Sequence, residues 1–505
     1  MRHEKRFGDS QLTMTVRMQR LGRLLIRAKP VHAGVDDDGK SGLSRSLGLF
    51  SLTMLGVGST IGTGIFFTLA ETVPKAGPAA ILSFLIAAMT AGLTALCYSE
   101  LSFRIPAAGS SYSYAYATVG EFAAYLVAAC LLLEYGLAAS ATSIGWSAYL
   151  NDFLHNAFGW QIPEMLRSYM IVSGERGIEI HPGRINLPPI VLVVMCGVLL
   201  LRGAKDSATV NSVMVLIKVA ILVFFSVVAL TGFSAGNLTP FFNPDNSKGF
   251  AGMAGVSAAA GTVFFSFIGL DTVATAGEEV NNPKRNVPLG ILAALSIVTV
   301  CYLLVAVAAV GAQPASHFAG QTAGLSVILH KVTGKTWPSL ILSAGAVISV
   351  FSVTLVSIYG QTRILYAISR DGLIPKVFQQ VHARTSAPVN NTIIVCVLVG
   401  MMAGFVDAIF LWDMVSMGTL VAFAVVSAAV PVLRRKGIGD DSDGFRVPFG
   451  PYLIPGMSIL ACLYIVKDLS LTTHMVFSIC MAIAVVGYFT YGIRNSRLNN
   501  AVAES

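Results

Sequence analysis

The first long apolar run of the chain contains the stretch Gly56-Val57-Gly58-Ser59-Thr60-Ile61-Gly62-Thr63-Gly64-Ile65-Phe66. Glycines alternate here with other residues, and a serine and two threonines lie among them. A helix interior tolerates glycine poorly, because each glycine destabilises it by roughly 0.5–1 kcal/mol relative to alanine. The stretch therefore predicts a helix that unwinds easily at this point.

The composition places this stretch in a membrane. Hydrophobic residues make up 54% of the 505 residues and charged residues only 12%, with a mean hydropathy of +0.71. Soluble globular proteins carry about 25% charged residues. The composition excludes an ordinary soluble protein, so the net charge of +8 is interpreted through membrane topology and predicts no nucleic-acid partner.

Twelve apolar runs are long enough to cross a bilayer core of about 30 Å at about 1.5 Å per helical residue. They lie near residues 48–72, 78–103, 121–150, 187–203, 207–231, 249–277, 287–311, 338–370, 390–406, 409–433, 451–469 and 473–494. In this arrangement most of the 34 lysine and arginine residues lie on the side of the N-terminus. Because positively charged residues favour the cytoplasmic side, both termini are expected there.

Outside these spans the chain offers no domain with chemistry of its own. Residues 1–47 form a basic tail and residues 495–505 a short C-terminal tail, on either side of a transmembrane domain at 48–494. Residues 12–27 fit either a basic amphipathic helix on an anionic leaflet or a disordered tail. All seven cysteines lie in apolar stretches without a CxxC motif, so neither disulfides nor a metal site is expected.

The sixth span repeats the polar interruption of the first, with the sequence Phe264-Phe265-Ser266-Phe267-Ile268-Gly269-Leu270-Asp271. Two interrupted spans in corresponding positions are typical of inverted-repeat secondary transporters, whose sites lie at the membrane midplane. The predicted halves are residues 48–231 and 249–433, and residues 451–494 add two helices. This favours a break in the first span, where freed N–H and C=O groups form a polar site. The alternative, a small-residue surface for helix packing, stays open.

Further motifs keep a fixed order along the twelve spans. They are GVGSTIGTGIF at 56–66, SELSFRIPAAGSSY at 99–112, LEY at 133–135, FFSFIGLD at 264–271, GEEVNNP at 277–283, and GQTR at 360–363 followed by SRDGL at 369–373. Their order and spacing resemble the amino acid, polyamine and organocation (APC) superfamily, and more narrowly its cationic amino acid transporter family. The resemblance implies an all-α polytopic membrane protein with about twelve transmembrane helices, in which a five-plus-five inverted repeat with broken helices 1 and 6 is followed by two C-terminal helices.

The resemblance also implies a substrate site at the two breaks. In similar transporters the substrate carboxylate lies on amides of the broken first helix, and the α-ammonium meets carbonyls of the broken sixth helix. The corresponding residues are Ile61, Gly62, Thr63 and Gly64 in the first helix, and Phe265, Ser266 and Ile268 in the sixth. Phe265 is the aromatic residue expected to close the outer side. Electrostatics supports the first pairing independently, because a helix N-terminus carries roughly half a positive charge and free N–H donors.

Lys218 lies near the middle of the fifth span and reaches neither surface. A central lysine costs about 2.5–3.5 kcal/mol on insertion scales, so it is expected to face the helical bundle and to have a partner. Proton-coupled members of the superfamily resemble this chain in having a lysine here, which implies a titrating group that couples substrate movement to protons. The alternative is a permanently charged strut bonded to carbonyls of the broken first helix.

Glu134 lies at mid-span in the third helix, beside alanines that leave room around it. One interpretation is a contact with the cationic side chain of arginine, lysine or ornithine. The other is a structural partner for a buried donor such as Lys218. A separate group of charged residues gathers near the cytoplasmic side, either as gate salt bridges or as a solvated rim: Glu100, Arg104, Glu278, Glu279, Arg370 and Asp371.

Together these features predict a proton-linked amino acid permease of the plasma membrane that favours cationic substrates. The alternatives are a neutral or broad-specificity exchanger or facilitator, and an amino acid sensor that does not transport. No metalloprotease or nucleotide-binding motif is present, so neither an enzyme nor a cofactor is expected. The expected partners are an L-amino acid, protons and membrane lipid, and the sequence does not determine whether a small accessory subunit or a sterol binds.

Overall fold

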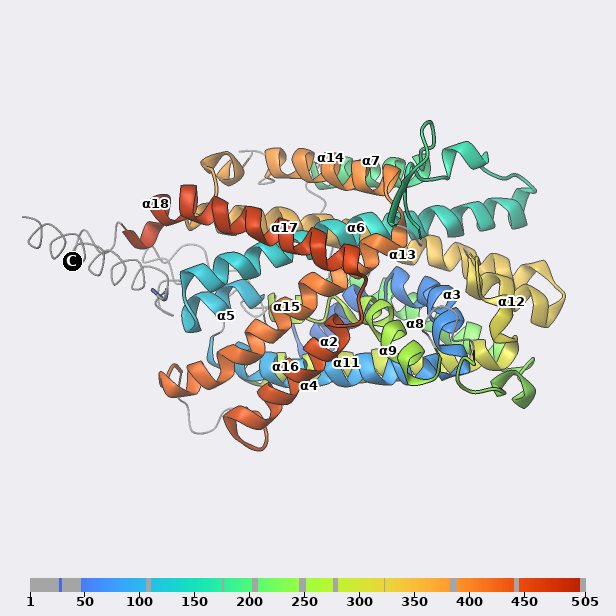
Figure 1. Ribbon diagram of the computed structural model, residues 1–505, viewed down its shortest axis with the longest axis horizontal. Coiled ribbons are helices and arrows are strands. Elements are labelled where there is room, and N and C mark those ends of the chain that lie inside the picture. The colour runs from blue at the N-terminus through green and yellow to red at the C-terminus, as the bar shows by residue number, and fades with distance from the viewer. Residues whose placement is uncertain are drawn as a thin grey trace, which may run out of the picture.

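The computed structural model describes residues 27–29, 47–105, 110–174, 177–201, 208–244, 251–275, 280–321, 323–381, 388–439 and 445–499. Residues 12–26 of the predicted amphipathic stretch, and Glu278 and Glu279 of the predicted charged group, lie outside these ranges. The described chain is almost entirely helical (Figure 1).

Apolar helices occupy all twelve predicted spans, which confirms the all-α polytopic fold. The main elements are α2 (Leu49–Thr60), α3 (Thr63–Ala76), α4 (Ala80–Arg104), α5 (Ser110–Thr118), α6 (Glu121–Phe158), β1 (Ile171–Gly174), β2 (Gly177–Ile180), α7 (Leu187–Leu201), α8 (Ala208–Leu230), α9 (Met253–Phe264), η5 (Phe265–Phe267), α10 (Thr272–Thr275), α11 (Pro283–Ala312), α12 (Gly324–Thr333), α13 (Thr336–Arg370), α14 (Val389–Phe405), α15 (Ala408–Arg435), α16 (Gly450–Val466), α17 (Leu471–Gly487), η9 (Tyr488–Gly492) and α18 (Ile493–Asn495). Among the described residues, eight helical segments are long and apolar enough to cross a membrane, and α2, α7, α14 and α16 are shorter apolar helices.

The first and sixth spans are broken, as the sequence predicts. The first span ends as α2 at Thr60 and resumes as α3 at Thr63. In the sixth span, α9 ends at Phe264, a single 3-10 turn follows, and the short helix α10 begins only at Thr272. Both breaks lie deep in the bundle, where protein surrounds the unwound backbone.

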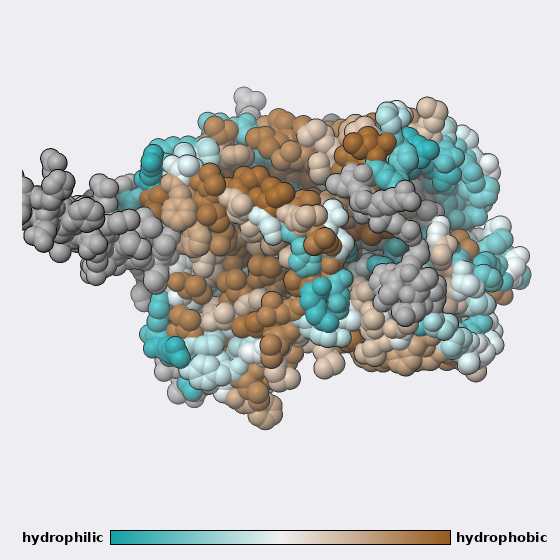
Figure 2. All heavy atoms as spheres, in the orientation of Figure 1, coloured by the Kyte–Doolittle hydropathy of each residue, from teal (hydrophilic) through white to brown (hydrophobic). Residues whose placement is uncertain are grey.

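The two ends of the bundle are distinct. We call the end where Arg27 bonds Asn499 the tail face, and the end that carries the β1–β2 hairpin the hairpin face; Figure 1 shows them at opposite ends of the long axis. In Figure 2 hydrophobic residues cover the middle of the visible surface, and hydrophilic residues gather at both ends. This distribution suits a bilayer around the middle of the bundle.

The longest loop on the hairpin face is a surface connection, but it contains structure that the sequence analysis did not predict. Helix α6 continues to Phe158, beyond its predicted end at 150, and an antiparallel pair of short strands follows. The hairpin is fixed to the start of α15, because the Asp407 N–H donates to the Ile171 carbonyl at 2.9 Å.

On the tail face, Glu100 joins three parts of the chain. Its fully buried carboxylate accepts two hydrogen bonds from Arg434, at 2.7 and 2.6 Å, and one from the Val447 N–H at 2.8 Å. Arg104 also pairs with it, at 3.3 Å. Part of the predicted charged group therefore forms buried ion pairs, although the main partner, Arg434, was not predicted.

Candidate functional site

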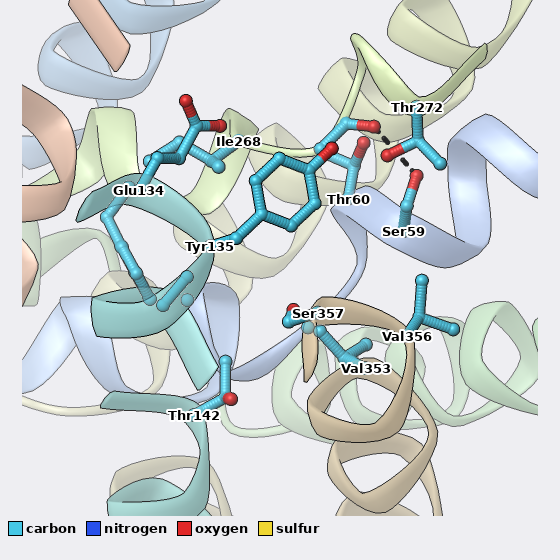
Figure 3. Close-up of a pocket in the computed structure, with 15 residues that line it drawn as sticks. Ser59, Thr60, Glu134, Tyr135, Thr142, Ile268, Thr272, Val353, Val356 and Ser357 are labelled. Atoms are coloured by element: carbon cyan, nitrogen blue, oxygen red, sulfur yellow. Dashed lines mark hydrogen bonds between the residues drawn. The ribbon is translucent and has the colours of Figure 1, made fainter. Parts of the chain in front are cut away.

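A cavity lies where the two helix breaks meet helices α6 and α13. Figure 3 shows residues of α2, α6 and α13 around the same space, with Ile268 and Thr272 of the sixth span beside them. The lining residues are Ser59, Thr60, Gly62, Gly64, Glu134, Tyr135, Ala138, Thr142, Phe265, Ile268, Gly269, Thr272, Val353, Val356 and Ser357. Five of the predicted site residues are therefore brought together here: Gly62, Gly64, Glu134, Phe265 and Ile268.

The N-terminal end of α3 faces this cavity. The Gly62 N–H turns back and donates to the Thr60 carbonyl at 2.8 Å. The amides that begin α3, from Thr63 onward, have no acceptor within their own helix, because the first N–H groups of any helix lack one. Together with the positive end of the helix dipole, they form a place where a carboxylate is stabilised.

The opposite end of the first break is capped by side chains from other helices. The Lys218 Nζ donates to the Gly58 carbonyl at 2.9 Å, and the Tyr302 hydroxyl lies 2.9 Å from the Thr60 carbonyl. Both side chains are buried. The negative end of α2 is thus satisfied within the protein, whereas the positive end of α3 is directed at the cavity.

The carbonyls of the sixth-span break are partly engaged. The Ile268 N–H donates to the Phe265 carbonyl at 3.4 Å, and the Tyr302 hydroxyl lies 2.9 Å from the Ser266 carbonyl. A carbonyl oxygen has two lone pairs, so both groups retain a site for a further donor. Ser266 itself packs behind the cavity against α3, and Ile61 is fully buried; neither is among the lining residues.

Two close contacts hold the breaks together. At Gly64 a β-carbon would lie only 2.5 Å from the Ser266 Oγ, and at Gly269 only 2.7 Å from the Ser59 carbonyl oxygen. The Ser59 Oγ also donates to the Gly269 carbonyl at 2.8 Å (Figure 3). Gly269 has a φ of +102°, a conformation that residues with a β-carbon rarely adopt. Glycine is therefore required at both contacts.

Aromatic rings lie on the side of the cavity toward the hairpin face. Phe265 lines the cavity and lies 6.0 Å from the ring of Trp412, which in turn lies 6.3 Å from Phe67. Both Phe265 and Trp412 are buried. The placement agrees with the position expected for a residue that closes the outer side, while its gating role stays a prediction.

Glu134 is one of the α6 residues that line the cavity. It is only 2% exposed. Among the described residues no ion pair joins it to Lys218, which instead bonds Gly58. The structural partnership between Glu134 and Lys218 is therefore not found.

Several lining residues were missed by the sequence analysis. Tyr135 donates to the Asp271 Oδ2 at 3.3 Å and packs its ring over Gly360 of α13, so it borders the cavity on the side of the tail face. Its adjacency to Glu134 in the LEY motif was a usable signal. Thr142, Val353 and Ser357 had no such signal, because ordinary apolar helices contain the same residue types.

The described residues contain no group of three or more His, Cys, Asp or Glu side chains that could hold a metal ion. The polar groups of the cavity are backbone amides, carbonyls, hydroxyls and one carboxylate. Donors and acceptors of this kind are suited to a small zwitterion.

Comparisons with known proteins show which family the chain belongs to. A family model described as amino acid permease matches residues 47–498. The chain is 38% identical to the methylthioribose transporter of Bacillus subtilis (strain 168), over 94% of this chain and 99% of that relative. It is 37% identical to the branched-chain amino acid permease BcaP of the same organism, over 91% and 96%. It is 38% identical to the vacuolar cationic amino acid transporter 4 of Arabidopsis thaliana, over 81% and 67%.

Replacing Gly269 with alanine tests the contact between the breaks. We expect Gly269→Ala to lower folding stability by about 1–3 kcal/mol, because the new methyl group meets the Ser59 carbonyl in a strained backbone conformation. The measurement is the midpoint of thermal unfolding of the purified protein in detergent. Gly48→Ala is the matched control, since Gly48 has a φ of −83° and no atom within 4 Å of the new β-carbon. Equal midpoints for the two variants would show that the breaks are not held at this contact.

Proposed function

The chain belongs to the amino acid permease family, and from this premise we propose that it carries an L-amino acid across the plasma membrane by alternating access, with both termini in the cytoplasm. Members of this family and the relatives above are transporters and not enzymes. The observation that carries the proposal is the cavity at the two breaks. It offers helix N–H groups for a carboxylate within reach of carbonyls for an ammonium, the two groups that all α-amino acids share.

The proposed substrate class is cationic, and Glu134 supports this choice. A buried carboxylate without a cationic partner is costly, and a bound arginine, lysine or ornithine would supply that partner. The hydroxyls of Thr142 and Ser357 lie in the same cavity and suit a polar side chain. One of the relatives is named a cationic amino acid transporter.

A neutral substrate is the second candidate. Ala138, Val353, Val356 and Ile268 give the cavity an apolar wall, which suits an aliphatic side chain. Another relative, which the chain matches over more of its length, is named a branched-chain amino acid permease. In this case Glu134 would be protonated, or hydrated as a carboxylate, and would not pair with the substrate.

Proton coupling is proposed to act through Lys218. As an ammonium it makes a charge-assisted hydrogen bond to the Gly58 carbonyl, at the negative end of α2. Loss of the proton weakens this bond and frees the inner half of the first span to move relative to α8. Proton binding and movement of the substrate-binding helix are thereby linked.

Uptake into proteoliposomes tests the transport proposal. We would compare radiolabelled L-arginine and L-leucine with and without an inward proton gradient. Saturable uptake of either compound supports a permease, and the preferred compound identifies the substrate class. A protein that binds an amino acid but shows no flux would be a sensor, which contradicts the proposal.

The variant Glu134→Gln separates the two substrate classes. For a cationic substrate we expect a loss of affinity of about 30-fold or more, because truncating a buried charge pair costs about 2–5 kcal/mol. Binding of L-leucine should change by less than about threefold, since it makes no such pair. The matched control is Glu179→Gln on β2, an exposed carboxylate outside the cavity. Equal losses for arginine and leucine would assign Glu134 a structural role.

The variant Lys218→Met tests coupling. It retains the length and apolar stem of the side chain and removes the titrating group, so we expect uptake to continue at a lower rate but to lose its stimulation by the proton gradient. Lys335→Met, at an exposed lysine on the hairpin face, should retain the stimulation. Uptake that ignores the gradient in the unaltered protein and in both variants would identify Lys218 as a strut.

A further inference from the structure

Two acidic side chains on the tail face, Glu121 and Asp371, bond to parts of the chain that are distant in sequence. Glu121, at the start of α6, is fully buried and accepts hydrogen bonds from the Tyr116 hydroxyl at 2.9 Å, the Tyr488 hydroxyl at 3.0 Å and the Ser496 Oγ at 2.5 Å. These donors come from α5, from η9 and from the C-terminal end. The carboxylate therefore joins α5 and α6 to the C-terminal end.

The N-terminal tail supplies the cation for this carboxylate. Arg27 pairs with Glu121 at 2.6 Å and donates to the Asn499 Oδ1 at 2.5 Å. The Glu121 N–H returns a hydrogen bond to the Arg27 carbonyl at 2.9 Å. Only 12% of the Arg27 side chain is exposed, so this pair is largely removed from water.

Lys29 makes a second ion pair two residues later. Its Nζ lies 2.9 Å from the Asp371 Oδ1, just beyond the end of α13, and its N–H donates to the Tyr116 carbonyl at 3.2 Å. Asp371 also accepts from the Tyr112 hydroxyl at 2.7 Å. The described tail segment, residues 27–29, is thus bonded to both acidic side chains and directly to the backbone of α5.

Helix α5 connects this cluster to helices that lie closer to the cavity. It contacts α10, the short helix that follows the sixth-span break, and it contacts α15. It is also bonded to α4, through Tyr98 and Ser111. Thr272 of α10 lines the cavity. A restraint on α5 is therefore transmitted by direct contact to the helix that borders the cavity toward the tail face.

We propose that residues Arg27–Lys29 are a docking element that binds the Glu121–Asp371 cluster reversibly and, by holding α5 against α10, slows opening of the cavity at the tail face. The occupant of the site is this chain's own basic segment. The segment carries a guanidinium and an ammonium two residues apart. Each pairs with one carboxylate of the cluster, and each carboxylate also accepts a hydrogen bond from at least one tyrosine hydroxyl. Release of the segment removes two ion pairs from α5 and its neighbours, so α10 moves more freely.

Labelling of a cysteine in the cavity tests this inference without any substrate, so its outcome is separate from that of the transport proposal. The reporter is Thr272→Cys in nanodiscs, labelled with a hydrophilic maleimide, and the same protein without it gives the background of the native cysteines. Adding Arg27→Ala and Lys29→Ala should raise the labelling rate at least about threefold, as a shift toward an open population requires. Glu121→Gln, which removes the charge from the receptor side, should act in the same direction.

A peptide of residues 21–31 supplies the docking element in trans. In the double alanine variant it should return the labelling rate toward that of the unaltered tail, while the same peptide with alanine at 27 and 29 should not. A second reporter, Thr72→Cys on α3, lies in the half of the bundle toward the hairpin face and should not label faster. Two results would overturn the inference. One is a labelling rate at Thr272→Cys that stays the same or falls when both cations are removed, and the other is a rate that the peptide does not change.

Discussion

Backbone polar groups inside a bilayer must find partners, and this constraint determines the centre of the structure. Breaking the first span frees carbonyls at the end of α2 and amides at the start of α3. Lys218 and Tyr302 satisfy the carbonyl end from α8 and α11. The amide end has no comparable cap among the described residues, and it is directed at the cavity. At one end of the break the backbone groups therefore have partners within the protein, and the other end is open to the cavity.

The same constraint explains why the two breaks lie against each other. Each unwound segment provides partners for the other, as the Ser59–Gly269 hydrogen bond shows, and the Tyr302 hydroxyl lies between a carbonyl of each. Such close backbone approach is possible only where β-carbons are missing, at Gly64 and Gly269. The glycines thus act less by making helices unstable than by letting two breaks share one set of hydrogen bonds.

The sequence predicts what depends on local composition. Apolar length located the twelve spans, and glycine content located both breaks. The central position of Lys218 in its span predicted a buried partner, and one of the predicted partners was a carbonyl of the first helix, as the bond to Gly58 shows. The sequence did not identify Tyr302 or Arg434 as partners. Each bonds an acceptor on a different helix, and which helices pack together cannot be deduced from residue spacing along the chain. The end of α6 was misplaced because Asn151 and Asp152 end the apolar run, whereas the helix continues to Phe158.

The side chains of the two faces interact differently, through aromatic contacts on one face and ion pairs on the other. The proposed alternating access would use that difference. Toward the hairpin face, Phe265 and Trp412 lie beside the cavity in an apolar aromatic contact, which is less directional than an ion pair. On the tail face, ion pairs at the fully buried Glu100 and Glu121 and at the partly exposed Asp371 connect helix ends. Breaking such a pair exposes charge that needs water or a new partner. In the proposed mechanism, opening at the tail face is the step that charge controls, either through a proton on Lys218 beside the first break or through the cations of the N-terminal tail.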